Sequence, residues 1–298
     1  MTLEVFGWSK QRQDAFAGYA ADGFLPGRVV SEHRSHFRVA TAVTELSAEV
    51  SGRLRNDTVL RSDLPGVGDF VALRLAVSDG PATIEAVLPR STALVRKASG
   101  ENRPQLLAEN VDVVFIVTAP DEDFNQARIE RLLALVRDSG AAPVIILNKA
   151  DLAGDAKVMT KQIAAIAPEV PLHFISARAR HSLGPIDGYF DGNRTIGLIG
   201  SSGVGKSTLT NELLGRDAQL TQAVRAHDNR GRHTTTHRQL FLCPGGGCLI
   251  DTPGMRAVES WIAAGIGGDE DRAARQLLQS STDDRTERKH RRGRRIGR

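Results

Sequence analysis

The stretch TIGLIGSSGVGKSTL, residues 195–209, decides the fold. Its apolar beginning is typical of a buried strand, its middle of a glycine-rich loop and its end of a helix start. The pattern G-x-x-x-x-G-K-S runs from Gly200 to Ser207. Glycines let the backbone N–H groups of such a loop curl around a phosphate, and the helix N-terminus adds favourable partial charge. The stretch therefore predicts an α/β domain with a phosphate-binding loop.

The chain on both sides of this loop alternates between apolar strands and helices. Further strands are predicted at 111–119, 142–149, 171–177 and 245–254, and helices at 124–140 and 157–167. Buried parallel strands that are joined by helices form a doubly wound sheet. We predict such a domain over residues 104–260.

Two loops of this domain carry residues suited to a guanine base. Asn148, Lys149 and Asp151 follow the apolar run VIIL, and Ser176-Ala177 follow LHFI. The Asp151 carboxylate can accept hydrogen bonds from the N1–H and 2-amino group of guanine, which adenine cannot offer, and such a site can discriminate by as much as ~10⁴. We expect Asn148 to tie loops together near the base, Lys149 to cover the purine face and the Ala177 N–H to donate to guanine O6.

The phosphates and a Mg²⁺ ion are expected at the other loops. Lys206 would neutralise β- and γ-phosphate oxygens, and the Ser207 hydroxyl would take one Mg²⁺ position. In DTPG (251–254), Asp251 can hold Mg²⁺ through water and the Gly254 N–H can reach a γ-phosphate. The predicted GTP-binding residues are Asn148, Lys149, Asp151, Ser176, Ala177, Ser201, Ser202, Gly203, Val204, Gly205, Lys206, Ser207, Thr208 and Gly254.

The order of these motifs is unusual. GTPases ordinarily have the phosphate loop first, then D-x-x-G, N-K-x-D and S-A. Here N-K-A-D and S-A precede the phosphate loop, and DTPG comes last. Because the termini of compact domains often lie close together, this order indicates a circular permutation of the same sheet.

The sequence before this domain has a different pattern, made of short β-type runs. After an N-terminal segment, residues 1–27, with a helix from about residue 9 to 19, about five short β-type runs with no helix fill residues 28–97. They predict a small closed barrel of the OB type, which often binds nucleic acid. Its few aromatic residues, Phe37 and Phe70, leave open that it only packs on its neighbour.

Composition and charge limit the remaining possibilities. The 41% hydrophobic and 25% charged content is typical of a globular protein, and no apolar run reaches the ~18 residues of a membrane span. No secretory signal is visible, and two cysteines favour a reducing cytoplasm. Because residues 285–298 carry a net +7 and the chain totals +4, the rest has a net −3. This tail is either a solvated extension or an electrostatic arm for nucleic acid.

Eight segments together resemble a known family. They are PGRV (26–29), LPGVGDF (64–70), AENVDVVFIV (108–117), FNQARIERLL (124–133), NKADL (148–152), GSSGVGKST (200–208), GRHTTTH (231–237) and DTPGMR (251–256). Over residues 5–260 the chain resembles the ribosome small subunit-dependent GTPase A family, circularly permuted GTPases of bacterial 30S maturation. The resemblance implies a cytoplasmic, monomeric GTP hydrolase that binds GTP and GDP with Mg²⁺, contacts the 30S ribosomal subunit and its 16S rRNA, and binds no membrane.

The resemblance also assigns the segment GRHTTTH as the first switch. Thr235, or next to it Thr234, would reach Mg²⁺ when the γ-phosphate is present, and His233 is a candidate for orienting the attacking water. Many GTPases place a glutamine directly after D-x-x-G, where this chain has Met255, so slow intrinsic turnover is expected. The predicted catalytic residues are His233, Lys206 and Thr235, and the predicted Mg²⁺ ligands are Ser207, Thr235 and Asp251.

The chain departs from the family at its C-terminus. Members usually carry a zinc domain with three cysteines and a histidine after the GTPase domain. Beyond Trp261 this chain has no cysteine, and His290 is its one histidine there. Cys243 and Cys248 flank a Gly-Gly-Gly turn without companion ligands, so we predict core residues rather than a zinc site. Residues 261–298 are thus expected to form a helical and basic tail.

The resemblance implies that the protein is a GTP-driven checkpoint in late small-subunit assembly, stimulated by the subunit, with the barrel contacting ribosomal RNA. One alternative is a GTP-regulated RNA-binding module whose hydrolysis is incidental. Another is a GTPase that no longer engages ribosomes because the zinc domain is missing.

Overall fold

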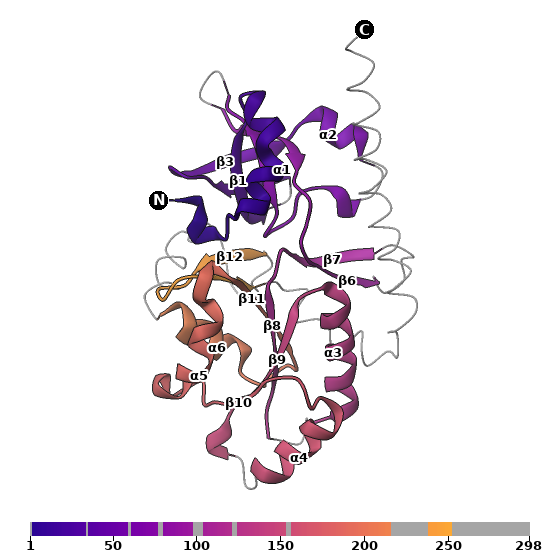
Figure 1. Cartoon of the computed structure of the whole chain (residues 1–298), viewed down its shortest axis with the longest axis vertical. Helices are drawn as coiled ribbons and strands as arrows, with labels where there is room; N and C mark the ends of the chain where they lie inside the picture. Colours follow the sequence, from indigo (N-terminus) through magenta and orange to yellow (C-terminus); the bar gives the residue numbers. More distant parts are fainter. Residues whose placement is uncertain are drawn as a thin grey trace, which may run out of the picture.

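The computed structural model describes residues 2–33, 35–58, 61–76, 80–97, 104–120, 124–152, 156–215 and 238–251. Within them the chain forms a β-barrel and an α/β domain, one above the other in Figure 1. No helix in these ranges is both long and apolar enough to cross a membrane. The predicted switch at 231–237, the turn 252–254 and the tail 261–298 lie outside the described residues.

The barrel closes from five strands, which confirms the predicted architecture. They are β1 (Leu25–His33), β2 (His36–Ala40), β3 (Glu45–Val50), β4 (Phe70–Arg74) and β5 (Ala82–Val87). The strand order is β1-β2-β3-β5-β4, and β4 pairs back onto β1. Helix α1 (Lys10–Ala21) lies against this barrel, where its buried Phe16 joins Phe70, Ala72 and Leu88 in a small apolar cluster.

One expectation for the barrel was wrong, because the stretch contains a helix. Helix α2 (Gly52–Asp57) follows β3, and the Ser51 Oγ caps it by accepting the Leu54 N–H at 3.0 Å. A serine directly after a strand satisfies the first free N–H groups of the next helix. With only six residues, the helix has too short an apolar pattern to be recognised from periodicity.

The α/β domain is the predicted doubly wound sheet. Strands β8 (Val113–Thr118), β9 (Ala142–Leu147), β10 (Leu172–Phe174), β11 (Thr195–Gly200) and β13 (Cys248–Asp251) run parallel in the order β10-β9-β8-β11-β13. Helices α3 (Gln126–Ser139) and α4 (Ala156–Ile166) flank one side, and α5 (Gly184–Asp187) and α6 (Lys206–Leu214) the other (Figure 1). Alternate residues of β8 face the two layers: Val114 packs with the α3 cluster, whereas Phe115 packs with the α6 cluster.

Three strands were not predicted as such. Strands β6 (Ala93–Lys97) and β7 (Pro104–Glu109) form an antiparallel hairpin, and β12 (Gln239–Leu242) lies antiparallel to β13. Strand β12 also pairs with barrel strand β1 through Ser31 and Gln239, so a single hydrogen-bonded sheet runs through both domains. The four residues of β12 carry too little periodicity to separate this strand from a loop.

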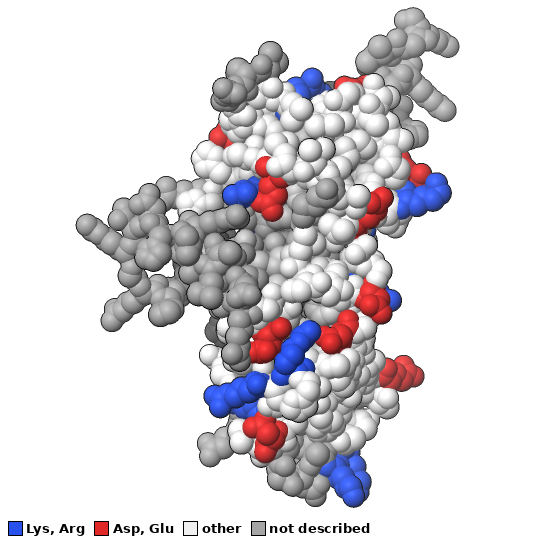
Figure 2. Space-filling model, turned by 90° about the vertical axis from the view of Figure 1, so that its left-hand side faces the viewer, with Lys and Arg blue, Asp and Glu red and all other residues white. Residues whose placement is uncertain are grey.

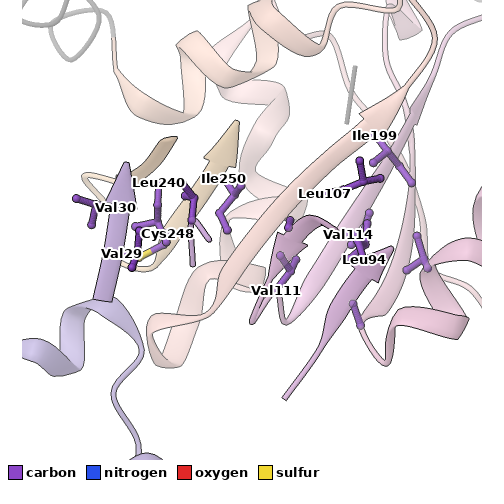
Figure 3. Packing of buried hydrophobic residues seen from close by; sticks show 14 of the residues in the cluster. Val29, Val30, Leu94, Leu107, Val111, Val114, Ile199, Leu240, Cys248 and Ile250 are labelled. Atoms are coloured by element: carbon purple, nitrogen blue, oxygen red, sulfur yellow. The ribbon is translucent and has the colours of Figure 1, made fainter. Parts of the chain in front are cut away.

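The two domains share one apolar core. Buried residues from the barrel and from the α/β sheet belong to a single contact cluster. Figure 3 shows Val29 of β1 beside Leu240 of β12 and Cys248 and Ile250 of β13. The seam between the domains is therefore packed like a domain interior, and we expect the two to move little as independent bodies.

Arg28 on β1 makes the polar connection across this seam. Its side chain is 1% exposed, and it donates to the carbonyls of Gly68 (3.1 Å) and Asn110 (3.1 Å) and to Thr195 Oγ1 (2.8 Å). The guanidinium also lies 4.7 Å from the centre of the Phe70 ring. Burial lowers the pKa of Arg28. One side chain thus joins the barrel, the end of β7 and the first residue of β11.

A second buried network supports the barrel side of the seam. Asp69 is fully buried and receives Arg90 through two hydrogen bonds, Nε to Oδ1 at 2.8 Å and Nη2 to Oδ2 at 2.6 Å. The Asn110 amide donates to Asp69 Oδ1 at 3.3 Å and to the Gly68 carbonyl at 3.2 Å. The segments LPGVGDF and AENVD therefore meet at the domain seam.

Replacing Arg28 by methionine keeps much of its length and removes every donor. Because each buried acceptor left without a donor costs ~1–3 kcal/mol, we expect Arg28→Met to lower the free energy of unfolding by about 3 kcal/mol. Urea unfolding measures the change. Arg53→Ala, at a side chain that is 81% exposed, is the control and should stay within ~0.5 kcal/mol of the parent chain. Equal unfolding midpoints for the two variants would contradict the role of Arg28.

Candidate nucleotide-binding site

The loop between β11 and α6 has the shape of a phosphate cradle. Gly200, Gly203 and Gly205 have φ of +142°, +86° and +95°, which side chains disfavour. A Cβ on Gly200 would come within 2.0 Å of the Val117 carbonyl oxygen, so the loop lies directly on β8. No side chain caps α6, and a helix N-terminus of this kind can bind an anion.

Lys206 begins α6 and turns back into the loop. Its side chain is 8% exposed, and Nζ donates to the carbonyls of Gly200 and Ser201. A buried ammonium that is held by two carbonyls can exchange them for phosphate oxygens, which are stronger acceptors. Ser202, Gly203, Ser207 and Thr208 are exposed along the same loop, whereas Ser201 and Val204 are buried.

Asn148 connects the phosphate loop with both predicted base loops. It is 2% exposed; its Nδ2 donates to the Val204 carbonyl at 2.7 Å, and its Oδ1 accepts the Ala177 N–H at 2.8 Å. A Cβ on Gly205 would lie 2.2 Å from Asn148 Nδ2. Since the Ala177 N–H already donates to Asn148, a guanine O6 placed there would have to share this donor.

Asp151 lies at the mouth of the site. Its side chain is exposed, and a hydrogen bond from Ser176 holds the pKa of its carboxyl below the ordinary value. Asp151 is therefore ionised at neutral pH and presents acceptors to a ligand. Lys149 between these loops adopts a left-handed conformation with φ of +59°.

Two contacts in this region were not predicted from the sequence. The Arg128 guanidinium at the start of α3 donates to Ser201 Oγ in the phosphate loop. Ser182 Oγ accepts the Ser176 N–H at 2.9 Å and donates to the Ser176 carbonyl at 2.8 Å, which fixes the backbone beneath Asp151. Arg128 falls in the segment FNQARIERLL, but no spacing rule links that helix to the loop.

The predicted metal site is described only in part. Ser207 stands exposed in the first turn of α6, where a hydroxyl oxygen suits Mg²⁺, and Asp251 ends β13. His233, Thr234, Thr235, Gly254 and Met255 lie outside the described residues. Within the described ranges, no three His, Cys, Asp or Glu side chains gather as a metal site.

The two cysteines lie close to the domain core. Cys248 is fully buried, and Cys243 is partly buried against the α6 cluster. Burial raises the pKa of Cys243 to about 12 and that of Cys248 to about 11. Within the described residues neither thiol belongs to a group of three potential metal ligands, which a zinc site would need. The absence of zinc from the whole chain stays a prediction.

Comparison with known proteins decides the family. A family model described as RsgA GTPase matches residues 87–261. The Small ribosomal subunit biogenesis GTPase RsgA of Opitutus terrae is 43% identical over 270 residues, which cover 88% of this chain and 74% of the relative. The chain belongs to the RsgA GTPase family. The resemblance seen in the sequence is thereby confirmed, as is the assignment of the protein as a GTPase.

Further relatives and solved structures agree. The protein of the same name from Streptomyces coelicolor is 41% identical over 272 residues, covering 90% of this chain and 72% of the relative. YjeQ from Thermotoga maritima has a TM-score of 0.60 at 24% identity, covering 79% of this chain and 76% of that one. YloQ, described as a circularly permuted GTPase, has a TM-score of 0.56 at 23% identity over 77% of this chain and 71% of that one. At these identities the likeness shows the fold alone, and it confirms the permuted order.

Asn148→Ala tests the connection between the loops. The substitution leaves the Val204 carbonyl and the Ala177 N–H without their buried partner, at ~1–3 kcal/mol for each group. We expect affinity for GDP and GTP to fall at least about tenfold, because the bound arrangement of the loops is no longer prepared. Titration with a fluorescent guanine nucleotide measures it. Unchanged affinity in a variant that melts like the parent chain would contradict this role.

Proposed function

We propose that the protein is a GTPase of late small ribosomal subunit assembly, active in the cytoplasm as a monomer and stimulated by the 30S subunit. The Asn148 link, which prepares phosphate and base loops together, is the observation that carries the nucleotide part. Support for the ribosomal part comes from the relatives, which are named small ribosomal subunit biogenesis GTPases and match most of this chain. In this proposal the nucleotide state reports whether assembly is complete.

In the proposed reaction each loop has a separate task. Lys206 would leave its two carbonyls and contact β- and γ-phosphate oxygens, while the N–H groups of 201–208 surround the β-phosphate. Ser207, Thr235 and Asp251 would hold Mg²⁺, which when bound neutralises charge that develops on the phosphates. The Gly254 N–H would meet the γ-phosphate. Asp151 and Lys149 would hold the guanine.

For the barrel we propose contact with 16S rRNA through polar side chains rather than through base stacking. Phe37 is 5% exposed and Phe70 is 1% exposed, so neither can stack on a base. Figure 2 shows Lys and Arg interspersed with Asp and Glu on the face in view. An RNA contact of this kind depends on phosphate attraction and is sensitive to salt. The basic tail 285–298 would add to it.

If Asp151 recognises the guanine base, replacing it should change which nucleotide the protein prefers. Asp151→Asn removes the carboxylate that would accept the guanine N1–H and 2-amino protons. We expect GTP affinity to fall at least about a hundredfold while xanthosine triphosphate, which has a carbonyl at C2, binds better than GTP. Competition against a fluorescent nucleotide measures both. If the unmodified chain binds ATP as well as GTP, the assignment of Asp151 is wrong.

The role proposed for His233 can be tested in the hydrolysis step. Met255 cannot hydrogen-bond a water, whereas a neutral imidazole can hold one in line with the γ-phosphate. His233→Ala should keep nucleotide affinity within a few-fold and lower subunit-stimulated turnover by ~10²-fold or more. His227→Ala, in the same stretch of sequence, is the matched control. If His233→Ala still shows normal subunit-stimulated turnover, His233 does not orient the water, and the orienting group must come from the ribosome.

The direct test of the proposed function is GTP turnover with and without purified 30S subunits. We expect stimulation of at least tenfold at saturating subunits. Turnover that subunits leave unchanged, together with RNA binding that depends on the nucleotide, would instead support the RNA-binding module.

A further inference from the structure

Strand β12 stands between the nucleotide site and the barrel. On one side it pairs with β13, with Gln239 opposite Asp251 and Leu242 opposite Cys248. On its other side Gln239 pairs with Ser31 of barrel strand β1. Neighbouring strands lie ~4.8 Å apart, so the barrel backbone is ~10 Å from Asp251, the predicted Mg²⁺ residue. Figure 1 shows β12 in this intermediate position.

Strand β13 continues this connection into the phosphate loop. Ile250 pairs with Gly197 of β11, and β11 ends at Gly200, the first residue of the loop. Apolar contacts reinforce the same path, because Leu240 and Ile250 belong to the buried cluster that includes Val29 of the barrel (Figure 3). A backbone displacement at the phosphate loop would therefore have to pass from β11 through β13 and β12 to reach β1.

Arg238 anchors the beginning of β12. Its guanidinium is half-buried and donates through Nη2 to the Leu106 carbonyl of β7 at 2.5 Å. Among the described residues, β12 pairs with β1 through Ser31 and Gln239, and this pair alone fixes the register of the two strands only weakly. The bond from Arg238 supplies a second fixed point one residue away.

The seam beside this anchor contains a buried carboxyl group. Glu109, also on β7, is 1% exposed, and its Oε2 has no hydrogen-bond partner among the described residues. Burial raises the pKa of Glu109 to about 8, while the Arg238 charge acts to lower it. Because burial favours the uncharged carboxyl, we assign the anchoring of Arg238 to its hydrogen bond with the Leu106 carbonyl rather than to attraction by Glu109.

We propose that β12 transmits the nucleotide state to the barrel, with Arg238 as the positioning residue that keeps the strand in register. Ligand contacts at Asp251 displace β13, the paired Gln239 follows, and Ser31 on β1 follows Gln239. The inference deepens the proposed function by naming a route for its regulation. It rests on the guanine-nucleotide part of that function and needs no ribosome.

Hydrogen exchange of the full chain tests the route. Samples with Mg²⁺ and either GDP or a non-hydrolysable GTP analogue are compared at peptides that cover β1 and β7. We expect the exchange rates of these peptides to differ about fivefold between the two nucleotides, the lower end of common coupling energies. In Arg238→Ala the difference should shrink to less than twofold, while nucleotide affinity stays within about threefold.

Two further variants separate positioning from general damage. Arg238→Lys keeps a donor that can reach one carbonyl and should restore part of the difference. Arg74→Ala on β4, at a side chain that is 60% exposed, is the matched control and should keep all of it. A full nucleotide-dependent difference in Arg238→Ala, or none in the unmodified chain, overturns the proposal.

The ribosomal proposal and the route through β12 can be contradicted separately. An exchange difference that depends on Arg238, in a chain whose turnover the 30S subunit does not stimulate, supports this route and contradicts the proposed function. Stimulation by the subunit without any exchange difference in the barrel supports that function and overturns the route.

Discussion

The buried guanidinium of Arg28 is the interaction on which the two-domain arrangement depends. Arg28 lies on β1, the barrel strand that also pairs with β12. Its guanidinium donates to Thr195, the first residue of β11, and to the carbonyl of Asn110, directly after β7. A guanidinium loses most of its hydration when it is buried, so it is stable there only if several acceptors keep their places. The barrel, the β6–β7 hairpin and the phosphate-loop strand are therefore positioned by one set of bonds.

The circular permutation places the strands that carry the last motif next to the barrel. Strands β12 and β13 are the last described strands along the chain, and they form the side of the α/β sheet that adjoins barrel strand β1. The strand that ends at Asp251 is thus one strand away from β1. Asn148 makes the corresponding connection inside the nucleotide site, where one amide joins the phosphate loop to the loop of Ala177. Contiguous packed and hydrogen-bonded elements can carry coupling between sites, and here paired strands connect the two domains.

Much of the fold could be predicted because its signals are local. The strand-loop-helix pattern at 195–209 and the long helix ending at Gly140 depend on neighbours in sequence, and both are present. Helix α2 was missed because it has only six residues, and strand β12 because its four residues pair with β1, which is distant in sequence. Arg128 and Ser182 were missed for the related reason that their partners become neighbours only after folding. The roles of His233 and Thr235 remain predictions.

We propose that the guanine-nucleotide state of the protein controls its engagement of the small ribosomal subunit. The most direct measurement is the dissociation constant of the full chain for purified 30S subunits, determined by co-sedimentation with saturating GDP or with a non-hydrolysable GTP analogue. We expect binding at least about tenfold tighter with the GTP analogue, which corresponds to ~1.4 kcal/mol of coupling. Equal dissociation constants in the two nucleotide states would contradict it.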